Sequence, residues 1–144
     1  MSKHMTKVAG LMADLDLCTF VTRKGDALAG RPMSNNGEVD YDGDSYFFTW
    51  ETSGMVSDIE ADPRVAMTFQ RAPGVLAGAP LHLHIQGRAS IVRDHAAFEA
   101  HWSPDLERWF EDGIDTPGMV MLAVRATRIA YWDSQDEGDF EVAA

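Results

Sequence analysis

Cysteine is nearly absent from this sequence, and no long apolar segment opens it. Cys18 is the only cysteine, so the chain can form no intramolecular disulfide, which fits a reducing compartment. Near the N-terminus, Lys3 and Lys7 are followed by Asp14 and Asp16, and this spread of charge argues against a signal peptide or a membrane span. We therefore expect a cytoplasmic protein with no membrane partner.

Basic residues are also scarce. The sequence has 12 Lys and Arg against 23 Asp and Glu, which gives a formal net charge of −11. Because the acidic residues are spread along the chain, long-range electrostatics would repel nucleic acid and anionic membranes, and we expect neither as a partner. A local basic pocket could still bind one small anion, and Arg31 is a candidate for such a pocket.

Internal repeats, low-complexity segments and an interdomain linker are absent as well. With 144 residues and 45% hydrophobic content, the chain is large enough to bury its own core. We expect one domain over residues 1–144. The ends, residues 1–10 and 134–144, are expected to be flexible or loosely docked.

What the sequence does have is a series of short strand patterns separated by turn signals. The predicted strands are Leu17–Arg23, Ala27–Ser34, Ser45–Trp50, Val65–Gln70, Leu81–Gln86 and Met119–Val124. The predicted connections include turns at Lys24–Asp26, Asn35–Gly37 and Asp42–Gly43, and a loop over Ala72–Pro80. The last strand is apolar on both faces, as expected of a strand between the core and a second surface.

Four helices are predicted around these strands. They comprise an amphipathic helix with the stripe Val8, Leu11, Met12 and Leu15, a short helix capped by Thr52 or Ser53 that ends before Pro63, a helix over Ala96–Trp102 capped by Asp94, and a helix over Pro104–Phe110. Several short strands with turns at close spacing, together with helices packed outside them, predict a mainly β (α+β) fold. Its architecture would be a small antiparallel barrel.

The region after Arg31 combines three features suited to binding a phosphate. One predicted strand carries this fixed cation, a second is followed by the hydroxyl of Ser53, and a helix begins beside both. A helix N-terminus offers free N–H groups and the positive end of a dipole, and an arginine adds a forked donor.

A set of motifs in a fixed order points to a known family. They are RPM at residues 31–33, FFTW at 47–50, DPRVAMTF from 62, IQGRASIVRD from 85, WF at 109–110 followed by Gly113, and AYWD at 130–133. From Leu11 to Asp133 the chain resembles the general stress protein branch of the pyridoxamine 5'-phosphate oxidase-like, FMN-binding split-barrel family. The resemblance implies a Greek-key split barrel, a homodimer, and a flavin in a groove between the subunits.

The resemblance also implies a set of cofactor-binding residues. Arg31 and Ser53 would bind the phosphate, and Pro32 and Met33 would run past the flavin ring. Phe48 and Thr49 match an aromatic–Thr pair that contacts the cofactor through its backbone and hydroxyl. Trp132 matches a late aromatic residue that can approach the flavin, although it could equally be a core or interface residue, and His82, beside His84, is expected to line the groove. Two positions depart from the family. Gly54 stands where the oxidase relatives carry Arg, and Met55 stands where the family usually has Lys. A missing charge-assisted hydrogen bond would weaken FMN binding roughly ten- to hundredfold.

Other groups of residues have weaker chemical interpretations. His82 and His84 share a strand face, but no third ligand has useful spacing, so no metal site is expected. Four acidic residues, Asp40, Asp42, Asp44 and Glu51, imitate a calcium loop, but Ser45 replaces its glycine and a strand follows. We interpret them as an acidic hairpin, and Cys18 as a core thiol.

Two functions follow, and both stay open. The chain has no convincing nucleophile–base pair or paired carboxylates, so a catalytic role would depend on the flavin, with an unidentified small molecule or nicotinamide as substrate. The alternative is a non-catalytic binding or sensor protein that binds FMN weakly or binds another ligand, such as FAD, a deazaflavin or haem. We do not expect pyridoxamine-phosphate oxidase activity, because the chain is short and lacks a match to that enzyme's substrate-binding C-terminal segment.

Overall fold

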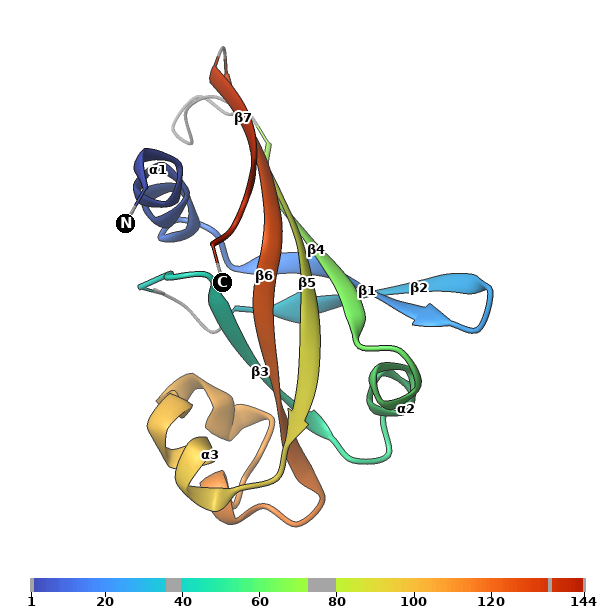
Figure 1. Cartoon of the computed structure of the whole chain (residues 1–144). Helices are drawn as coiled ribbons and strands as arrows, with labels where there is room; N and C mark the ends of the chain where they lie inside the picture. Colours follow the sequence, from blue (N-terminus) through green and yellow to red (C-terminus); the bar gives the residue numbers. More distant parts are fainter. Residues whose placement is uncertain (1, 36–39, 73–79, 135, 144) are drawn as a thin grey trace.

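One antiparallel sheet of seven strands curls on itself to form an open barrel (Figure 1). In this computed structural model, residues 2–35, 40–72, 80–134 and 136–143 are described. The strands are β1 (Leu17–Lys24), β2 (Ala27–Ser34), β3 (Asp44–Trp50), β4 (Arg64–Arg71), β5 (Leu81–Val92), β6 (Met119–Asp133) and β7 (Asp136–Glu141). Their order is β2-β1-β4-β5-β6-β3, and β7 also pairs with β6.

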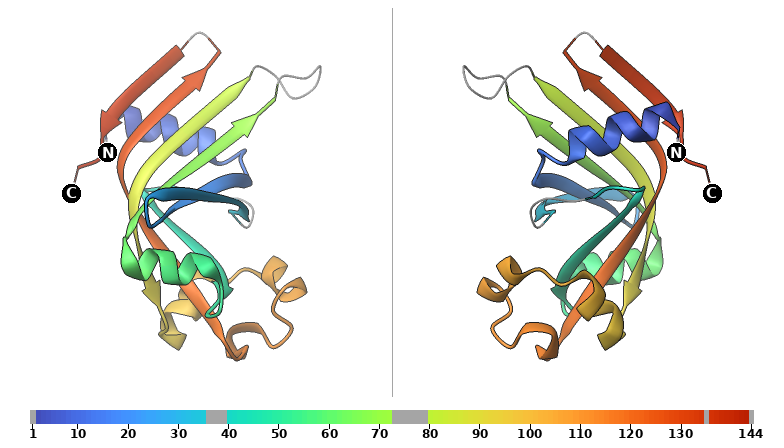
Figure 2. Two further views of the ribbon diagram at one scale, coloured as in Figure 1. Left: turned by 90° about the vertical axis from the view of Figure 1, so that its right-hand side faces the viewer. Right: turned by 90° about the vertical axis from the view of Figure 1, so that its left-hand side faces the viewer.

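The helices lie outside the sheet, at its ends and along one side (Figure 2). They are α1 (Lys3–Met12), α2 (Gly54–Ala61), α3 (His95–His101) and the 3-10 turns η1 (Pro104–Arg108) and η2 (Gly113–Asp115). α1 lies near the end where β6 turns into β7, whereas α3 and the two 3-10 turns lie at the opposite end. No helix among the described residues is long and apolar enough to cross a membrane.

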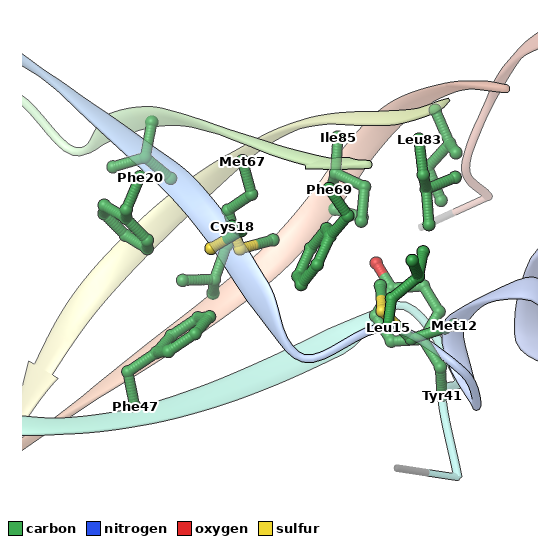
Figure 3. Close-up of a cluster of buried hydrophobic side chains, with 14 of the residues drawn as sticks. Met12, Leu15, Cys18, Phe20, Tyr41, Phe47, Met67, Phe69, Leu83 and Ile85 are labelled. Atoms are coloured by element: carbon green, nitrogen blue, oxygen red, sulfur yellow. The ribbon is translucent and has the colours of Figure 1, made fainter. Parts of the chain in front are cut away.

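The barrel interior is filled by every second side chain of the strands, as the pleat requires. Phe20 of β1 meets Phe47 of β3 edge to face, with 5.3 Å between ring centroids. Met67, Phe69 and Ile85 add to this layer from β4 and β5 (Figure 3). The inward-facing residues therefore join strands far apart in sequence into one core.

Most predicted elements are confirmed, but several differ. β5 runs to Val92 and does not end at Gln86, and β7 was not predicted. β6 is a single strand of 15 residues and does not end at Val124, because Ala126, Ile129 and Tyr131 continue its buried face. The helix predicted over Pro104–Phe110 is the shorter 3-10 turn η1. The predicted turn at Asn35–Gly37 and the loop at Ala72–Pro80 fall largely on residues 36–37 and 73–79, outside the described part of the chain.

The two ends of the chain carry regular structure within the described residues, and the expectation of flexible or loosely docked ends at residues 1–10 and 134–144 stays a prediction. α1 begins at Lys3 behind a Ser2 cap, and β7 pairs along β6. The two ends also contact each other, since the ring of His4 stacks on Phe140 with centroids 4.9 Å apart. This contact removes apolar surface of both ends from water.

The barrel is split between its two edge strands. β2 and β3 stand at opposite ends of the strand order, and no pairing joins them within the described residues. This confirms the predicted split-barrel fold. It also leaves an opening between the two edges, and the functional candidates gather there.

Candidate functional site

A cavity of about 370 Å³ lies at the opening between the edge strands. Its walls come from the start of β1, the end of β2, the end of β3 and the segment around η1. The lining residues are Leu17, Pro32, Met33, Ser34, Phe48, Thr49, Trp50, Leu106, Trp109 and Phe110. Four residues assigned to the flavin by sequence, Pro32, Met33, Phe48 and Thr49, are therefore brought together.

Aromatic packing fixes one wall of this cavity. Phe48 contacts Phe98 and Trp102 edge to face, at centroid distances of 5.9 and 5.3 Å. The ring centroids of Trp50 and Phe110 are 4.8 Å apart. Phe48, Phe98 and Phe110 belong to a second buried cluster, and Trp102 packs against it, so this wall is held in place before any ligand arrives.

The cavity offers mainly apolar contact and few polar groups. Its rim carries large exposed apolar side chains, with Leu17 64% and Trp109 65% exposed. Of its polar members, Ser34 already donates its hydroxyl to Asp16 at 2.6 Å. A flat, largely apolar ligand with a few polar edges suits such a lining.

Arg31 points away from this cavity into a network of polar side chains. Its Nη1 donates to Thr22 Oγ1 at 2.9 Å and to the Phe20 carbonyl at 3.3 Å. Thr22 in turn donates to Asp58 Oδ2 at 2.8 Å, and Arg31 Nη2 lies 3.5 Å from the same oxygen. Asp58 is only 6% exposed, so β1, β2 and α2 are joined by a buried carboxylate.

The N-terminus of α2 lies beside this network. Ser53 is the N-cap and accepts a hydrogen bond from Met55 N at 3.2 Å. Its own N–H donates to the Trp50 carbonyl at 2.9 Å, so a tight turn connects the cavity wall to the helix. The ammonium of Lys24 lies 4.0 Å from where a Cβ on Gly54 would stand, and 3.8 Å from Asp58 Oδ1.

The position of Met55 differs from what the sequence analysis assumed for it. Its side chain is 4% exposed and belongs to the main core cluster, as does Ile59 one turn later. A lysine substituted there would begin in the apolar interior, not on the exposed side of the helix. The cation that does approach the start of α2 is Lys24, which sequence reasoning missed.

The cavity and the polar network lie along the same strands. Arg31 of the network and Pro32 of the cavity are consecutive on β2, so the two regions adjoin. From Leu17, at the far side of the cavity, to Thr22 in the network, five residues of β1 span on the order of 17 Å at about 3.3 Å per residue. This spacing suits an elongated ligand with an apolar ring system at one end and an anion at the other.

Two predicted site residues are not brought to this cavity within one chain. His82 and Trp132 are paired across β5 and β6, and Trp132 is 48% exposed. Trp50 of the cavity pairs with Met119, at the other end of β6. Thirteen residues of strand separate Met119 from Trp132, roughly 43 Å.

The remaining candidates have structural roles. His84 shares a hydrogen bond of 3.1 Å with Thr68, and Asp42 accepts one from the backbone N–H of Asp44, where β3 begins. Within the described ranges, no group of three or more His, Cys, Asp or Glu side chains could hold a metal ion. Burial raises the pKa of the Cys18 thiol to about 12, so it is a protonated core residue.

Comparison with known proteins agrees with this architecture. The chain resembles General Stress Protein 26 from Bacillus anthracis (21% identity, 96% of this chain and 95% of the other, TM-score 0.72) and a protein related to general stress protein 26 from Clostridium acetobutylicum (17%, 97% and 95%, TM-score 0.77). It also resembles a heme binding protein from Mycobacterium smegmatis (14%, 98% and 59%, TM-score 0.75). No curated protein matches the chain.

At these identities the solved structures establish the fold alone. The family assignment comes from a family model, described as "Pyridoxamine 5'-phosphate oxidase like", which matches residues 3–144. This confirms the resemblance that the motifs between Arg31 and Asp133 indicated. The chain belongs to the pyridoxamine 5'-phosphate oxidase-like family.

Proposed function

We propose that this protein binds a flavin, FMN, in the cavity between β2 and β3. The observation that carries the proposal is the pairing of an apolar, aromatic-walled cavity of about 370 Å³ with cationic side chains further along the same strands. FMN has the same division, since a flat tricyclic ring is joined to a phosphate by a flexible chain. The groups present therefore fit the cofactor.

The residues have distinct parts in this proposal. Phe48 and Met33 contact the ring, and the Thr49 hydroxyl is a donor or acceptor at its edge. Arg31 and the Ser53-capped start of α2 attract the phosphate. A bound flavin would supply redox chemistry, and the protein would position the ring and exclude water from one side of it.

A homodimer is part of the same proposal. His82 and Trp132 lie at the far end of β6 from the cavity, so they can join this site only if a second copy supplies them. The exposed rings of Trp50, Trp109 and Trp132 are apolar surface that such an interface would cover. Light scattering at micromolar concentration should give about twice the 15.9 kDa chain mass, and a clean monomer would remove the shared site.

A second candidate is a binding or sensor protein without catalysis. The observation that favours it is the lining of the cavity, whose ten residues include no ionisable side chain that could serve as an acid, base or nucleophile. In the flavin oxidoreductase, the ring itself would carry electrons to a small molecule or a nicotinamide. In the sensor, binding alone would be the function, and FAD, a deazaflavin or haem would compete for the cavity. Reduction of bound FMN by NADH or NADPH under anaerobic conditions separates the two.

The direct test is the absorbance spectrum of the purified protein, followed by FMN titration monitored through quenching of flavin fluorescence. Met33→Trp should block binding, because the larger side chain fills the cavity. Leu28→Trp is the matched control on the same strand, since Leu28 is 73% exposed and lies outside the cavity. If the wild type leaves flavin fluorescence unchanged, or if Met33→Trp binds as well as the wild type, the cavity is not a flavin site.

A further inference from the structure

We infer that Lys24 is the second phosphate-binding cation of the site, together with Arg31. The inference rests on the proposed function, because it concerns the phosphate end of the same flavin. The position follows from the β1–β2 hairpin, in which Lys24 pairs with Ala27 at the turn and its side chain reaches toward α2. Two cations from neighbouring strands thereby face the first turns of one helix.

The Lys24 ammonium lies over Gly54, the first residue of α2. A Cβ built on Gly54 would have one neighbour within 4 Å in the described structure, the Lys24 ammonium at 4.0 Å. The space over the first residue of α2 is therefore open except for this charge. An anion approaching the helix N–H groups from that side would meet the ammonium directly.

The charge of Lys24 is available to a ligand. Its nearest acidic oxygen, Asp58 Oδ1, is 3.8 Å away, which is too long for a hydrogen bond, and its side chain is 66% exposed. Arg31 has fewer N–H groups left for a ligand, since its Nη1 already donates to Thr22 and to the Phe20 carbonyl. Asp58 carries one negative charge beside the two cations, so the group keeps one net positive charge.

Two other arginines near α2, Arg64 and Arg23, lie at its C-terminal end, beside the C-cap Asp62. Arg64 binds Asp62 through two hydrogen bonds of 3.0 and 2.7 Å. Arg23 also lies 3.9 Å from Asp62, at the opposite end of the helix from Gly54. Met55 contributes no charge and is buried in the core. Lys24 is thus the cation best placed to add to Arg31.

The test compares FMN with riboflavin, which has the same ring but no phosphate. Lys24→Met removes the charge and keeps an unbranched chain, and the exposed position protects the fold. FMN binding should weaken about tenfold, the value of one charge-assisted hydrogen bond to a partly exposed group, while riboflavin binding stays within about twofold. Lys24→Arg should retain most of the FMN affinity, and the effect of Lys24→Met should shrink as salt rises.

Lys3→Met is the matched control, because it changes the net charge equally from α1, away from this site. An equal loss of FMN affinity in both variants would assign the effect to overall charge and overturn the inference. An unchanged FMN affinity in Lys24→Met, or an equal loss for both ligands, would also overturn it while leaving flavin binding intact. A wild-type protein that binds neither flavin would refute the proposed function, and the inference with it.

Discussion

Replacing Asp58 should show how firmly the two cations are held. Asp58 accepts a hydrogen bond from Thr22 and faces the charges of Arg31 and Lys24, while being 6% exposed itself. Asp58→Ala would leave the Thr22 hydroxyl without its acceptor and Arg31 without its counter-charge. The Arg31 side chain is 25% exposed, so water could partly replace its lost partner, whereas Thr22 is 1% exposed and would stay unsatisfied.

The expected magnitude follows from these contacts. Removing one partner of a fully buried ion pair costs about 3–5 kcal/mol of stability. The Arg31 side chain is 25% exposed and 3.5 Å from the carboxylate, so we expect a smaller loss than for a fully buried pair, about 2–3 kcal/mol. Asp58→Asn retains an acceptor for Thr22 and should cost about 1 kcal/mol less than Asp58→Ala.

Urea unfolding followed by tryptophan fluorescence measures these differences. Glu60→Ala is the control, since Glu60 lies on the same helix with a 54% exposed side chain and should change stability by no more than about 0.5 kcal/mol. A double-mutant cycle with Thr22→Val should give a coupling energy of about 1 kcal/mol with Asp58→Ala. If Asp58→Ala is as mild as the control, or the coupling is zero, the network does not join β1 to α2.

Three further predictions concern single groups. Met55→Lys should lower stability by at least about 2 kcal/mol, because it places an ammonium in the core, and an unchanged urea midpoint would contradict the buried position. Cys18 should resist thiol reagents at pH 8 until the protein unfolds, because its pKa is raised to about 12; rapid labelling of the folded protein would show otherwise. The Arg64 guanidinium lowers the pKa of Asp62, so its stabilising effect is present above the ordinary carboxyl pKa and is lost as pH falls below it. Asp62→Asn should therefore reduce the loss of stability between about pH 5 and pH 3, and an unaltered acid profile would count against this pair.

The strands could be predicted where apolar residues alternate, because the pleat itself imposes that pattern. β6 was predicted too short because polar side chains interrupt the alternation after Val124, and its pairing with β5 shifts register between Gln86 and Gly87. The sign of that irregularity in the sequence is Gly87, because a Cβ there would lie 2.6 Å from the Arg125 carbonyl oxygen.

The candidate site was predictable in part for a similar reason. Phe48 and Thr49 could be identified because a motif contains them, but Lys24 reaches α2 only through the β1–β2 hairpin. For Met55, the sequence did contain a signal, since Ile59 lies four residues later and both face the core. The spacing of Met55 from Ser53 indicates how far along α2 it lies, and its spacing from Ile59 indicates that it lies on the buried side of the helix.

The contact between the two ends of the chain has a consequence for synthesis of the protein. Lys7 pairs with Asp133, 126 residues later, His4 stacks on Phe140, and the buried side chains of α1 join a core that includes Ile129 and Tyr131 of β6. The first helix leaves the ribosome long before the strands that cover it, so its apolar face must wait until translation is nearly finished. Contacts of such long range slow folding and leave surface open to chaperones or aggregation in the interval. Truncation of β7 should therefore also loosen the start of α1, where His4 stacks on Phe140, at the opposite end of the sequence.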